Sequence, residues 1–342
     1  MSVSNQPITS KDVAKLAGVS QSTVSRVFVP GSSVAEKTKQ KVYEAAKTLN
    51  YRPNAFARSL TTNESKLIGL VFPDSDYPIH METLQLISIE LQKQGYSAVL
   101  IPWKVENNQH HIPNIFQYRV DGVIAASATF NKSLYQECQQ FHIPIVQYAR
   151  VVEGTKSSYV VSDNYLAGQL AAQVFQRSGA QSVVYLTGQV PTLTNNEREQ
   201  GFRSEFAALT GRDIQVVETD FDYIAALDSI RQMMGQEQRP DAIFCATDTL
   251  AMAVMDVARI ELELAIPQDL QVIGFDNIPQ TQWLSYQLST FQQDFNRLAR
   301  EAVKIIIDQI AEPDTSMTKL MIPVTYVERN STKNELMNPN QL

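Results

Sequence analysis

Three polar side chains near the N-terminus, Gln21, Ser22 and Arg26, could form hydrogen bonds with the edges of DNA bases. Gln can pair bidentately with adenine and Arg with guanine, and helix-turn-helix proteins present such residues near the start of their second helix. This chemistry requires a short helix that begins near residue 21 and exposes these side chains. A generic helical hairpin is the alternative, because many helical pairs carry the same apolar spacing.

The surrounding segment, residues 11–28, has the pattern of two short amphipathic helices joined by a turn. Each half repeats apolar residues at i, i+3 and i+4, so each helix has one apolar stripe and one polar face. Gly18 can adopt the positive φ that ends the first helix, and the Ser20 hydroxyl can cap the second. The two stripes are Val13, Leu16 and Ala17, and Val24, Val27 and Phe28.

The charge of the chain is unevenly distributed. Residues 1–66 carry ten Lys and Arg against four Asp and Glu, whereas the whole chain of 342 residues has a net charge of −7. A basic head on an acidic body suggests a nucleic-acid-binding module fused to another function. A solvated charged face is the alternative explanation, but together with the helix-turn-helix pattern the charge favours DNA binding.

The segment that follows is expected to form a third helix over residues 35–49, with Ser33 and Glu36 spaced as a capping box. A very short helix over residues 55–60 comes next, and so few residues are not stable as a helix alone in water. Leu60 would then be an apolar side chain on a basic, conditionally folded segment, as in a wedge inserted at a minor-groove base step. Docking of Leu60 on the rest of the protein is the alternative.

The rest of the chain alternates apolar, β-branched runs with helical patterns, and this α/β series occurs twice. Two doubly wound parallel sheets would place the carboxyl ends of their strands around a cleft, where ligands bind in such folds. The expected strands cover 66–72, 96–102, 121–127 and 144–148, then 159–163, 183–188, 214–219, 242–247 and 271–276. The polar residues at strand ends are Asp74, Ser127, Arg150, Asp163, Thr247 and Asp276.

The chain lacks the sequence motifs of several classes of enzyme. The chain contains no GxGxxG, GxxxxGK[ST] or GxSxG pattern, so a dinucleotide enzyme, a P-loop hydrolase and an α/β-hydrolase are not indicated. Its two cysteines and four histidines show no metal-ligand spacing, and we expect no metal and no cofactor. Because the catalytic motifs are missing, we expect a protein that is not an enzyme. No signal peptide follows Met1 and no apolar run approaches a membrane span, so we expect a cytoplasmic protein.

Longer motifs then resemble one family. The runs SKDVAKLAGVSQSTVSRV, RVDGVI, VSDNYLAG, RxxGF at Arg198 to Phe202, PDAIFCATDTLAM, VIGFDN and LSTFQQ are similar to those of the lactose/galactose repressor family, in the family's order and spacing. The resemblance covers residues 9–331. It implies a helix-turn-helix head, a hinge helix that DNA orders, and a two-lobed body similar to type I periplasmic binding proteins. It also implies a ligand-responsive transcriptional repressor that binds a near-palindromic operator as a homodimer.

The resemblance assigns site residues by motif position. A small-molecule effector in the interlobe cleft would be held by a polar set in which Arg198 and Asp276 are the main anchors. The DNA-binding positions are Ser20, Gln21, Ser22, Thr23, Ser25, Arg26, Asn54, Ala57 and Leu60. The effector-binding positions are Arg150, Asp163, Arg198, Thr247, Asp276 and Trp283.

The chain departs from the family's pattern at the cleft. Residues 77–80 lack the usual aromatic pair, Ala149-Arg150 stands where many members have Asp-Arg, and Thr247 replaces a common Asn. Trp283 could supply a flat surface for a sugar ring, although a core position is the alternative. The family's commonest effectors are sugars or sugar acids, and Arg150 beside Arg198 favours an anionic ligand.

The expected organisation is a head over residues 1–52, a hinge over 53–65, a body over 66–332 and a flexible tail over 333–342. The tail contains no heptad repeat, so a dimer is expected rather than a coiled-coil tetramer. A cytoplasmic small-molecule-binding or enzymatic α/β protein with an accessory basic head is the competing hypothesis. Lobe 1 is expected over about 66–163 and 291–321, and lobe 2 over about 164–290 and 322–332.

Overall fold

The chain divides into two compact units, Met1–Lys66 and Leu67–Leu342. Asn54, Ala57 and Leu60, and with them the proposed hinge contacts, lie outside the residues described by the computed structural model, as do Asp74 and Ser127. The model describes residues 8–28, 32–52, 64–73, 77–103, 105–106, 109–110, 115–126, 132–152, 154–189, 192–313 and 315–333.

The described residues of the first unit form three helices, α1 (Ser10–Ala17), α2 (Gln21–Val27) and α3 (Glu36–Thr48). Gly18 ends α1 with a φ of 67°, and the Ser20 hydroxyl accepts a hydrogen bond of 3.1 Å from the Thr23 N–H, as predicted. The side chains of Val13, Val24 and Val42 are fully buried in the shared core. The three helices therefore form one small hydrophobic core, which the apolar stripes predicted.

Two details of this unit differ from expectation. Ala35, whose side chain cannot accept a hydrogen bond, is the N-cap residue of α3, so the predicted capping box of Ser33 and Glu36 is wrong. Leu16 lies on the predicted stripe but is 53% exposed, because the core is closed by Val13 and its neighbours on α2 and α3.

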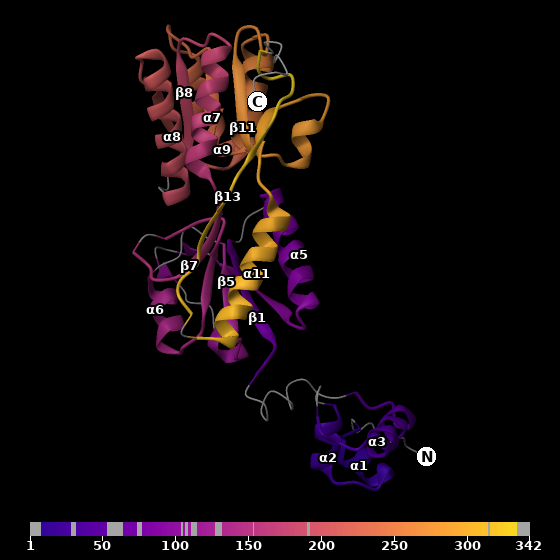
Figure 1. Cartoon of the computed structure of the whole chain (residues 1–342). Helices are drawn as coiled ribbons and strands as arrows, with labels where there is room; N and C mark the ends of the chain where they lie inside the picture. The colour runs from indigo at the N-terminus through magenta and orange to yellow at the C-terminus, as the bar shows by residue number, and fades with distance from the viewer. Residues whose placement is uncertain are drawn as a thin grey trace, which may run out of the picture. The chain divides into compact units, whose positions relative to one another are not determined.

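The second unit contains two six-stranded sheets, each forming one lobe. The first sheet is parallel throughout, with the order β13-β7-β6-β5-β1-β2. The helices α5 (Pro78–Lys93) and α11 (Phe295–Ala311) pack side by side on one face, and α6 (Lys132–Gln140) packs on the other (Figure 1). The strands are β1 (Leu67–Pro73), β2 (Ser97–Trp103), β5 (Gly122–Ala125), β6 (Ile145–Tyr148), β7 (Ser158–Ser162) and β13 (Lys319–Ile322).

The second sheet has the order β14-β12-β11-β10-β8-β9, and only its edge strand β14 is antiparallel to its neighbour. Four helices accompany it: α7 (Asn164–Arg177), α8 (Leu193–Thr210), α9 (Tyr223–Met234) and α10 (Asp248–Asp256). The strands are β8 (Val183–Gly188), β9 (Gln215–Thr219), β10 (Ala242–Cys245), β11 (Gln271–Asp276), β12 (Ser289–Gln292) and β14 (Thr325–Val327).

Shorter elements complete the unit: the strands β3 (Val105–Glu106) and β4 (Gln109–His110), the 3-10 helices η1 (Ile115–Tyr118) and η3 (Pro279–Gln282), and the π-helical turn η2 (Val257–Glu261). The chain crosses between the lobes after β7, after β12 and after β13, so each lobe is assembled from distant segments. This double α/β architecture confirms the predicted fold class.

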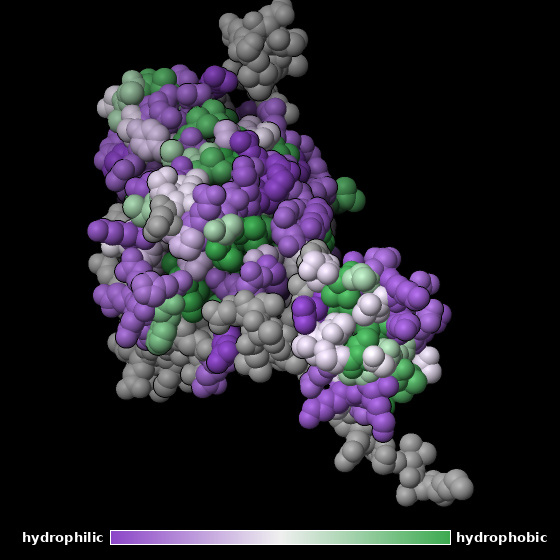
Figure 2. Space-filling model, turned by 60° about the horizontal axis from the view of Figure 1, so that its bottom comes forward, coloured by the Kyte–Doolittle hydropathy of each residue, from purple (hydrophilic) through white to green (hydrophobic). Residues whose placement is uncertain are grey.

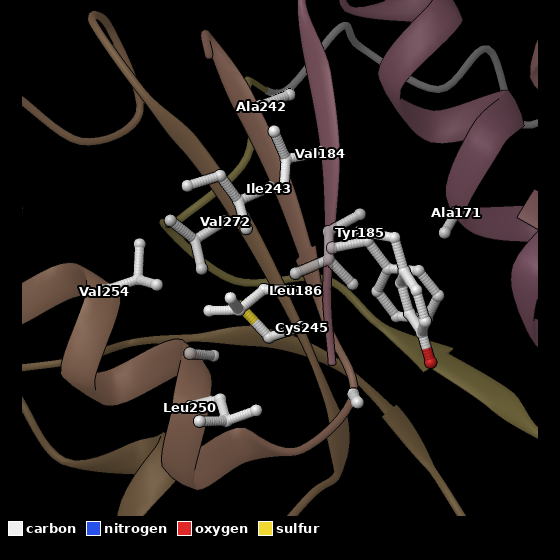
Figure 3. Close-up of a cluster of buried hydrophobic side chains, with 14 of the residues drawn as sticks. Ala171, Val184, Tyr185, Leu186, Ala242, Ile243, Cys245, Leu250, Val254 and Val272 are labelled. Carbon is white, nitrogen blue, oxygen red and sulfur yellow. The ribbon is translucent and has the colours of Figure 1, made fainter. Parts of the chain in front are cut away.

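The core of the second lobe lies on both sides of its sheet. Tyr185 of β8 points toward Ala171 of α7, whereas Leu250 and Val254 of α10 lie on the other side of the strands (Figure 3). Because both faces are covered, the central strands are buried along their length, as their continuous apolar runs predicted.

No helix in the described part of the chain is long and apolar enough to cross a membrane. The face of the molecule shown in Figure 2 is largely hydrophilic, with hydrophobic residues scattered in small groups.

Candidate functional site

A cavity of about 70 Å³ lies between the two lobes of the second unit. It is bounded by residues at the carboxyl ends of strands in both sheets, where ligands bind in doubly wound folds. The polar side chains that line it are Tyr77, His80, Thr83, Tyr148 and Arg150 from the first lobe, Asn164, Thr192, Thr194, Asn195, Arg198, Thr247 and Asp276 from the second, and Gln293 between β12 and α11.

Arg198 of α8 is held rigidly in the wall of the second lobe. Its Nε donates a 3.0 Å hydrogen bond to the Asn164 side chain, and its Nη1 donates a 2.6 Å bond to the Ala246 carbonyl. The guanidinium carbon lies 3.6 Å from the centre of the Phe275 ring, a cation–π contact. Arg198 is only 8% exposed, so three neighbours fix both the position and the plane of its charge.

Two glycines allow the helices that carry these groups to approach closely. A Cβ added to Gly168 of α7 would lie 2.2 Å from the Arg198 carbonyl oxygen, and one added to Gly201 of α8 would lie 2.1 Å from the Tyr165 carbonyl oxygen. Only residues without a Cβ permit this crossing. The contact brings Asn164, at the start of α7, within hydrogen-bonding distance of Arg198.

Asp276 ends β11 with a φ of 114°, a backbone conformation that L-residues rarely adopt. Its two carboxylate oxygens accept hydrogen bonds from Tyr77 of the first lobe and from Gln293. Burial raises the pKa of Asp276, and the hydrogen bond from Tyr77 and the charge of Arg198 oppose that rise. The Tyr77–Asp276 bond links the two lobes across the cavity.

A second acid, Asp248, supports the turn that carries Asp276. Asp248 is fully buried; its Oδ2 accepts a 2.9 Å bond from the Ile278 N–H, and its Oδ1 accepts a 2.5 Å bond from the Thr290 hydroxyl. A Cβ on Gly274 would lie 2.2 Å from Oδ1, so this glycine makes room for the carboxylate. Burial raises the pKa of Asp248 well above its ordinary value, and the charge of Asp276 adds to the rise.

Arg150 is the cation of the first-lobe wall. It follows Ala149, which has a φ of 58°, just after β6. Within the described part of the chain, no residue forms a hydrogen bond or an ion pair with the Arg150 guanidinium. Burial lowers the pKa of Arg150, whereas the Asp276 carboxylate raises it and the charge of Arg198 lowers it further.

His80 of α5 also lines the cavity. Burial lowers the pKa of His80 from 6.5 to about 4, and the charge of Arg150 contributes to the shift. His80 is therefore neutral at physiological pH. Its ring lies edge-on to Tyr77, with 5.6 Å between the ring centres.

In the first unit, the predicted DNA-reading residues lie on α2. Gln21, Ser22, Ser25 and Arg26 are exposed along this helix. The Gln21 amide donates a 3.0 Å hydrogen bond to the Ser10 hydroxyl of α1, and the Ser25 hydroxyl donates to the Gln21 carbonyl. Ser20 and Thr23 are joined through their hydroxyls at the start of α2, where they stabilise the first turn.

Comparisons with known proteins agree with both parts of this arrangement. Residues 9–54 match the family described as bacterial regulatory proteins, lacI family, and residues 172–332 match a periplasmic binding protein-like domain. The chain is 32% identical over 329 residues to the HTH-type transcriptional repressor PurR of Yersinia enterocolitica, covering 94% of this chain and 96% of that protein. The chain belongs to the lacI family.

Solved structures show the same fold for this LacI-family protein. A lac repressor dimer bound to operator and the anti-inducer ONPF aligns with a TM-score of 0.83 at 24% identity, over 96% of this chain and 100% of that one. A complex of the transcriptional regulator CelR with cellobiose aligns with a TM-score of 0.70 at 25% identity, over 95% and 99% of the two chains. The LacI-family chain is a ligand-responsive, DNA-binding transcriptional repressor.

The structure brings together four of the six predicted effector residues of this LacI-family protein: Arg150, Arg198, Thr247 and Asp276 line the cavity. Asp163 does not line it; its carboxylate caps α7 by accepting a 3.0 Å bond from the Leu166 N–H. Trp283 does not line it either, because it follows η3 on the outside of the lobe and is 56% exposed.

Among the cavity residues that the sequence did not assign, Tyr77, Asn164 and Gln293 make hydrogen bonds with the predicted anchors. Asn164 stands in the VSDNYLAG motif and Gln293 in LSTFQQ, so the motifs contained both residues without revealing their role. Tyr77 and Asp276 are 199 residues apart, and no local pattern predicts their contact. Among the described residues, no group of three or more His, Cys, Asp or Glu side chains could hold a metal ion.

Proposed function

We propose that this repressor binds a near-palindromic operator as a homodimer and that a small polar effector in the interlobe cavity changes its affinity for DNA. The observation that carries the proposal is the cavity between the lobes, which Arg198 and Asp276 line. The hydroxyl of Tyr77, from the first lobe, donates a hydrogen bond to Asp276 of the second lobe across this cavity. A ligand that replaces this interlobe bond favours one lobe arrangement over another, and such differential binding is what shifts a conformational equilibrium.

We infer that the effector is a sugar or sugar acid. Support comes from the polar lining of hydroxyl, amide and guanidinium groups beside the aromatic rings of Phe72, Phe221 and Phe275. The solved relative at 25% identity is a complex with cellobiose. We propose that the cavity binds its ligand without transforming it, since Asp276 is the one carboxylate among the described lining residues and both of its oxygens already accept hydrogen bonds.

The proposed DNA contacts come from α2 and from the hinge. Gln21, Ser22 and Arg26 would read bases, and Ser20, Thr23 and Ser25 would cap the helix or bind phosphate. Asn54, Ala57 and Leu60 would belong to a hinge over residues 53–65, with Leu60 entering the minor groove. The exposure of Gln21, Ser22 and Arg26 on one short helix supports this assignment.

The proposed homodimer uses apolar side chains exposed on the second lobe. Leu284 is 95% exposed, Ile260 is 75% exposed and Trp283 is 56% exposed. Arg259 donates a hydrogen bond to the Ser285 carbonyl, which brings the segments carrying these side chains together. Large apolar side chains exposed in one region are typical of protein interfaces. Leu284→Asp should yield monomers in sedimentation experiments, whereas Leu209→Asp, elsewhere on the same lobe, should leave the dimer intact.

The function is tested by selecting operators for the full-length protein from random DNA duplexes and then measuring affinity with and without candidate sugars. Arg26→Ala should weaken binding to the selected sequence by about 1–3 kcal/mol, as expected for a bidentate base contact. Lys47→Ala, an exposed change on α3, is the matched charge control. Failure to select any sequence, or a bound sugar that leaves DNA affinity unchanged, would contradict the proposal.

A further inference from the structure

The charged side chains that line the interlobe cavity do not balance. Its described lining contains two arginines, Arg150 and Arg198, against one carboxylate, Asp276, while His80 is neutral. A ligand that enters this cavity therefore meets a net positive charge in a site largely shielded from water, where electrostatic interactions are strong.

The partners of these groups show where that charge is available. Both oxygens of Asp276 accept hydrogen bonds from Tyr77 and Gln293. Arg198 uses Nε and Nη1 to bind Asn164 and a backbone carbonyl, which leaves Nη2 without a described acceptor. Arg150 has no hydrogen-bond or ion-pair partner among the described residues. Among the described residues, the second lobe thus has a fixed cation whose Nη2 donors have no acceptor, and the first lobe has a cation none of whose donors has one.

The backbone around Arg150 is nevertheless well held. Gln147 of β6 is buried and accepts a 2.6 Å bond from the Val152 N–H, while its amide donates to the hydroxyls of Thr155 and Ser157. These bonds tie both ends of the loop after β6 to the sheet. The backbone that carries Arg150 is thus held by described hydrogen bonds, so ligand binding has to order the Arg150 side chain but not these backbone segments.

A cation taken partly out of water without a partner is unfavourable, and an anion that pairs with it removes that cost. The planar guanidinium matches the two oxygens of a carboxylate or a phosphate in a bidentate arrangement, and the opposite charges make these hydrogen bonds stronger than those to neutral hydroxyls. The residue before Arg150 is Ala149, which has no carboxylate that could pair with the Arg150 guanidinium.

We propose that the effector of this protein carries a carboxylate or phosphate group and that Arg150 binds this group, with the free Nη2 of Arg198 facing it from the other lobe. The inference rests on the proposed function only in taking the interlobe cavity as the effector site. It narrows the effector from sugars in general to acidic molecules such as uronates or sugar phosphates.

The test compares matched probes on the full-length protein at constant ionic strength. D-glucose, D-glucuronate, D-glucose 6-phosphate and inorganic phosphate are titrated by calorimetry and by thermal shift. We expect at least one anionic probe to bind about 30-fold more tightly than D-glucose, as charge-assisted hydrogen bonds predict. The glucuronate and glucose 6-phosphate titrations distinguish a carboxylate from a phosphate effector.

Variants separate Arg150 from general charge effects. Arg150→Gln should remove the preference for the anionic probe, and Arg150→Lys should keep part of it. Arg119→Gln, an exposed change of the same charge in the same lobe, should leave it unchanged. Equal binding of D-glucose, an anion affinity within about threefold of wild type in Arg150→Gln, or no binding of any anionic probe would overturn the inference.

Failure of this inference and failure of the proposed function have different signatures. A neutral ligand that binds independently of Arg150 but still releases or strengthens operator binding would refute the acidic effector alone. An anion that binds through Arg150 without changing operator affinity would refute ligand control of DNA binding while leaving the Arg150 site in place.

Discussion

The two walls of the interlobe cavity are built differently. In the second lobe, Arg198 is fixed by Asn164, by a backbone carbonyl and by the Phe275 ring, and Asp276 is held by a turn that the buried Asp248 supports. In the first lobe, Arg150 extends from an ordered loop without a described partner. The contrast suggests that one wall is a rigid anchor and that the other selects the ligand.

The two walls should contribute differently to the stability of the fold and to the choice of ligand. Groups in the second-lobe wall take part in buried hydrogen bonds, so removing them leaves other buried polar atoms unpaired and destabilises the fold. Changes at Arg150 break no described contact, so they should alter ligand choice with little loss of stability.

The largest effect is expected from Arg198→Ala. Removing this buried, hydrogen-bonded cation takes the donors away from the Asn164 Oδ1 and the Ala246 carbonyl and should lower the free energy of unfolding by about 3–5 kcal/mol, besides abolishing effector binding. Arg203→Ala is the control on the same helix; its exposed ion pair with Asp213 should contribute less than about 1 kcal/mol. Chemical denaturation measures both. Similar stabilities for the two variants would remove the idea of a rigid wall.

Gly168→Ala should cost about 2–3 kcal/mol of unfolding free energy, because the new methyl group meets the backbone of α8 rather than a movable side chain. Separation of α7 and α8 would also pull Asn164 away from Arg198 and weaken ligand binding. Gln176→Ala, an exposed change on α7, should leave both stability and affinity unchanged. Ligand affinity equal to wild type in Gly168→Ala would show that the helix contact does not position Arg198.

Asp248→Asn tests the support of the Asp276 turn. An amide has one acceptor oxygen where the carboxylate has two, so either the Ile278 N–H or the Thr290 hydroxyl loses its acceptor. The expected loss is about 1–3 kcal/mol of unfolding free energy, with weaker effector binding because the turn loosens. Asp256→Asn, which affects the Tyr223 and Tyr286 hydrogen bonds away from the cavity, should leave effector affinity unchanged.

The residues of the second-lobe wall were also easier to predict from the sequence than those of the first-lobe wall. Arg198 and Asp276 stand in motifs whose order and spacing identified them, and the β-branched runs before Thr247 and Asp276 predicted the strands that place them. Strands β12, β13 and β14 were not predicted, because these segments lack the continuous apolar runs that marked equally short strands such as β5 and β10.

Other features depended on contacts that a sequence pattern does not contain. A strand-end aspartate such as Asp163 can face a cleft or cap the next helix, and in this structure the Asp163 carboxylate caps α7. Whether Trp283 lies inside or outside the lobe depends on how η3 packs. The interlobe bond from Tyr77 requires two distant segments to meet, so only the folded chain reveals it.

The smallest effect is expected from His80, in the selective wall, and it depends on pH. The unfolded chain protonates this side chain near pH 6.5 and the folded chain near pH 4, so between these values the unfolded state binds more protons. Stability should therefore be fully retained above pH 6.5 and fall as the pH drops toward 4, by about 1–2 kcal/mol at pH 5 after allowance for partial exposure.

Chemical denaturation of wild type and His80→Gln from pH 8 to 4.5 measures this fall in the free energy of unfolding. His80→Gln should lose the part of the pH dependence of the unfolding free energy that comes from His80. Because the charge of Arg150 helps to keep His80 neutral, Arg150→Gln should reduce this pH dependence slightly. Identical slopes in wild type and His80→Gln would show that this histidine is not neutralised by its place beside Arg150.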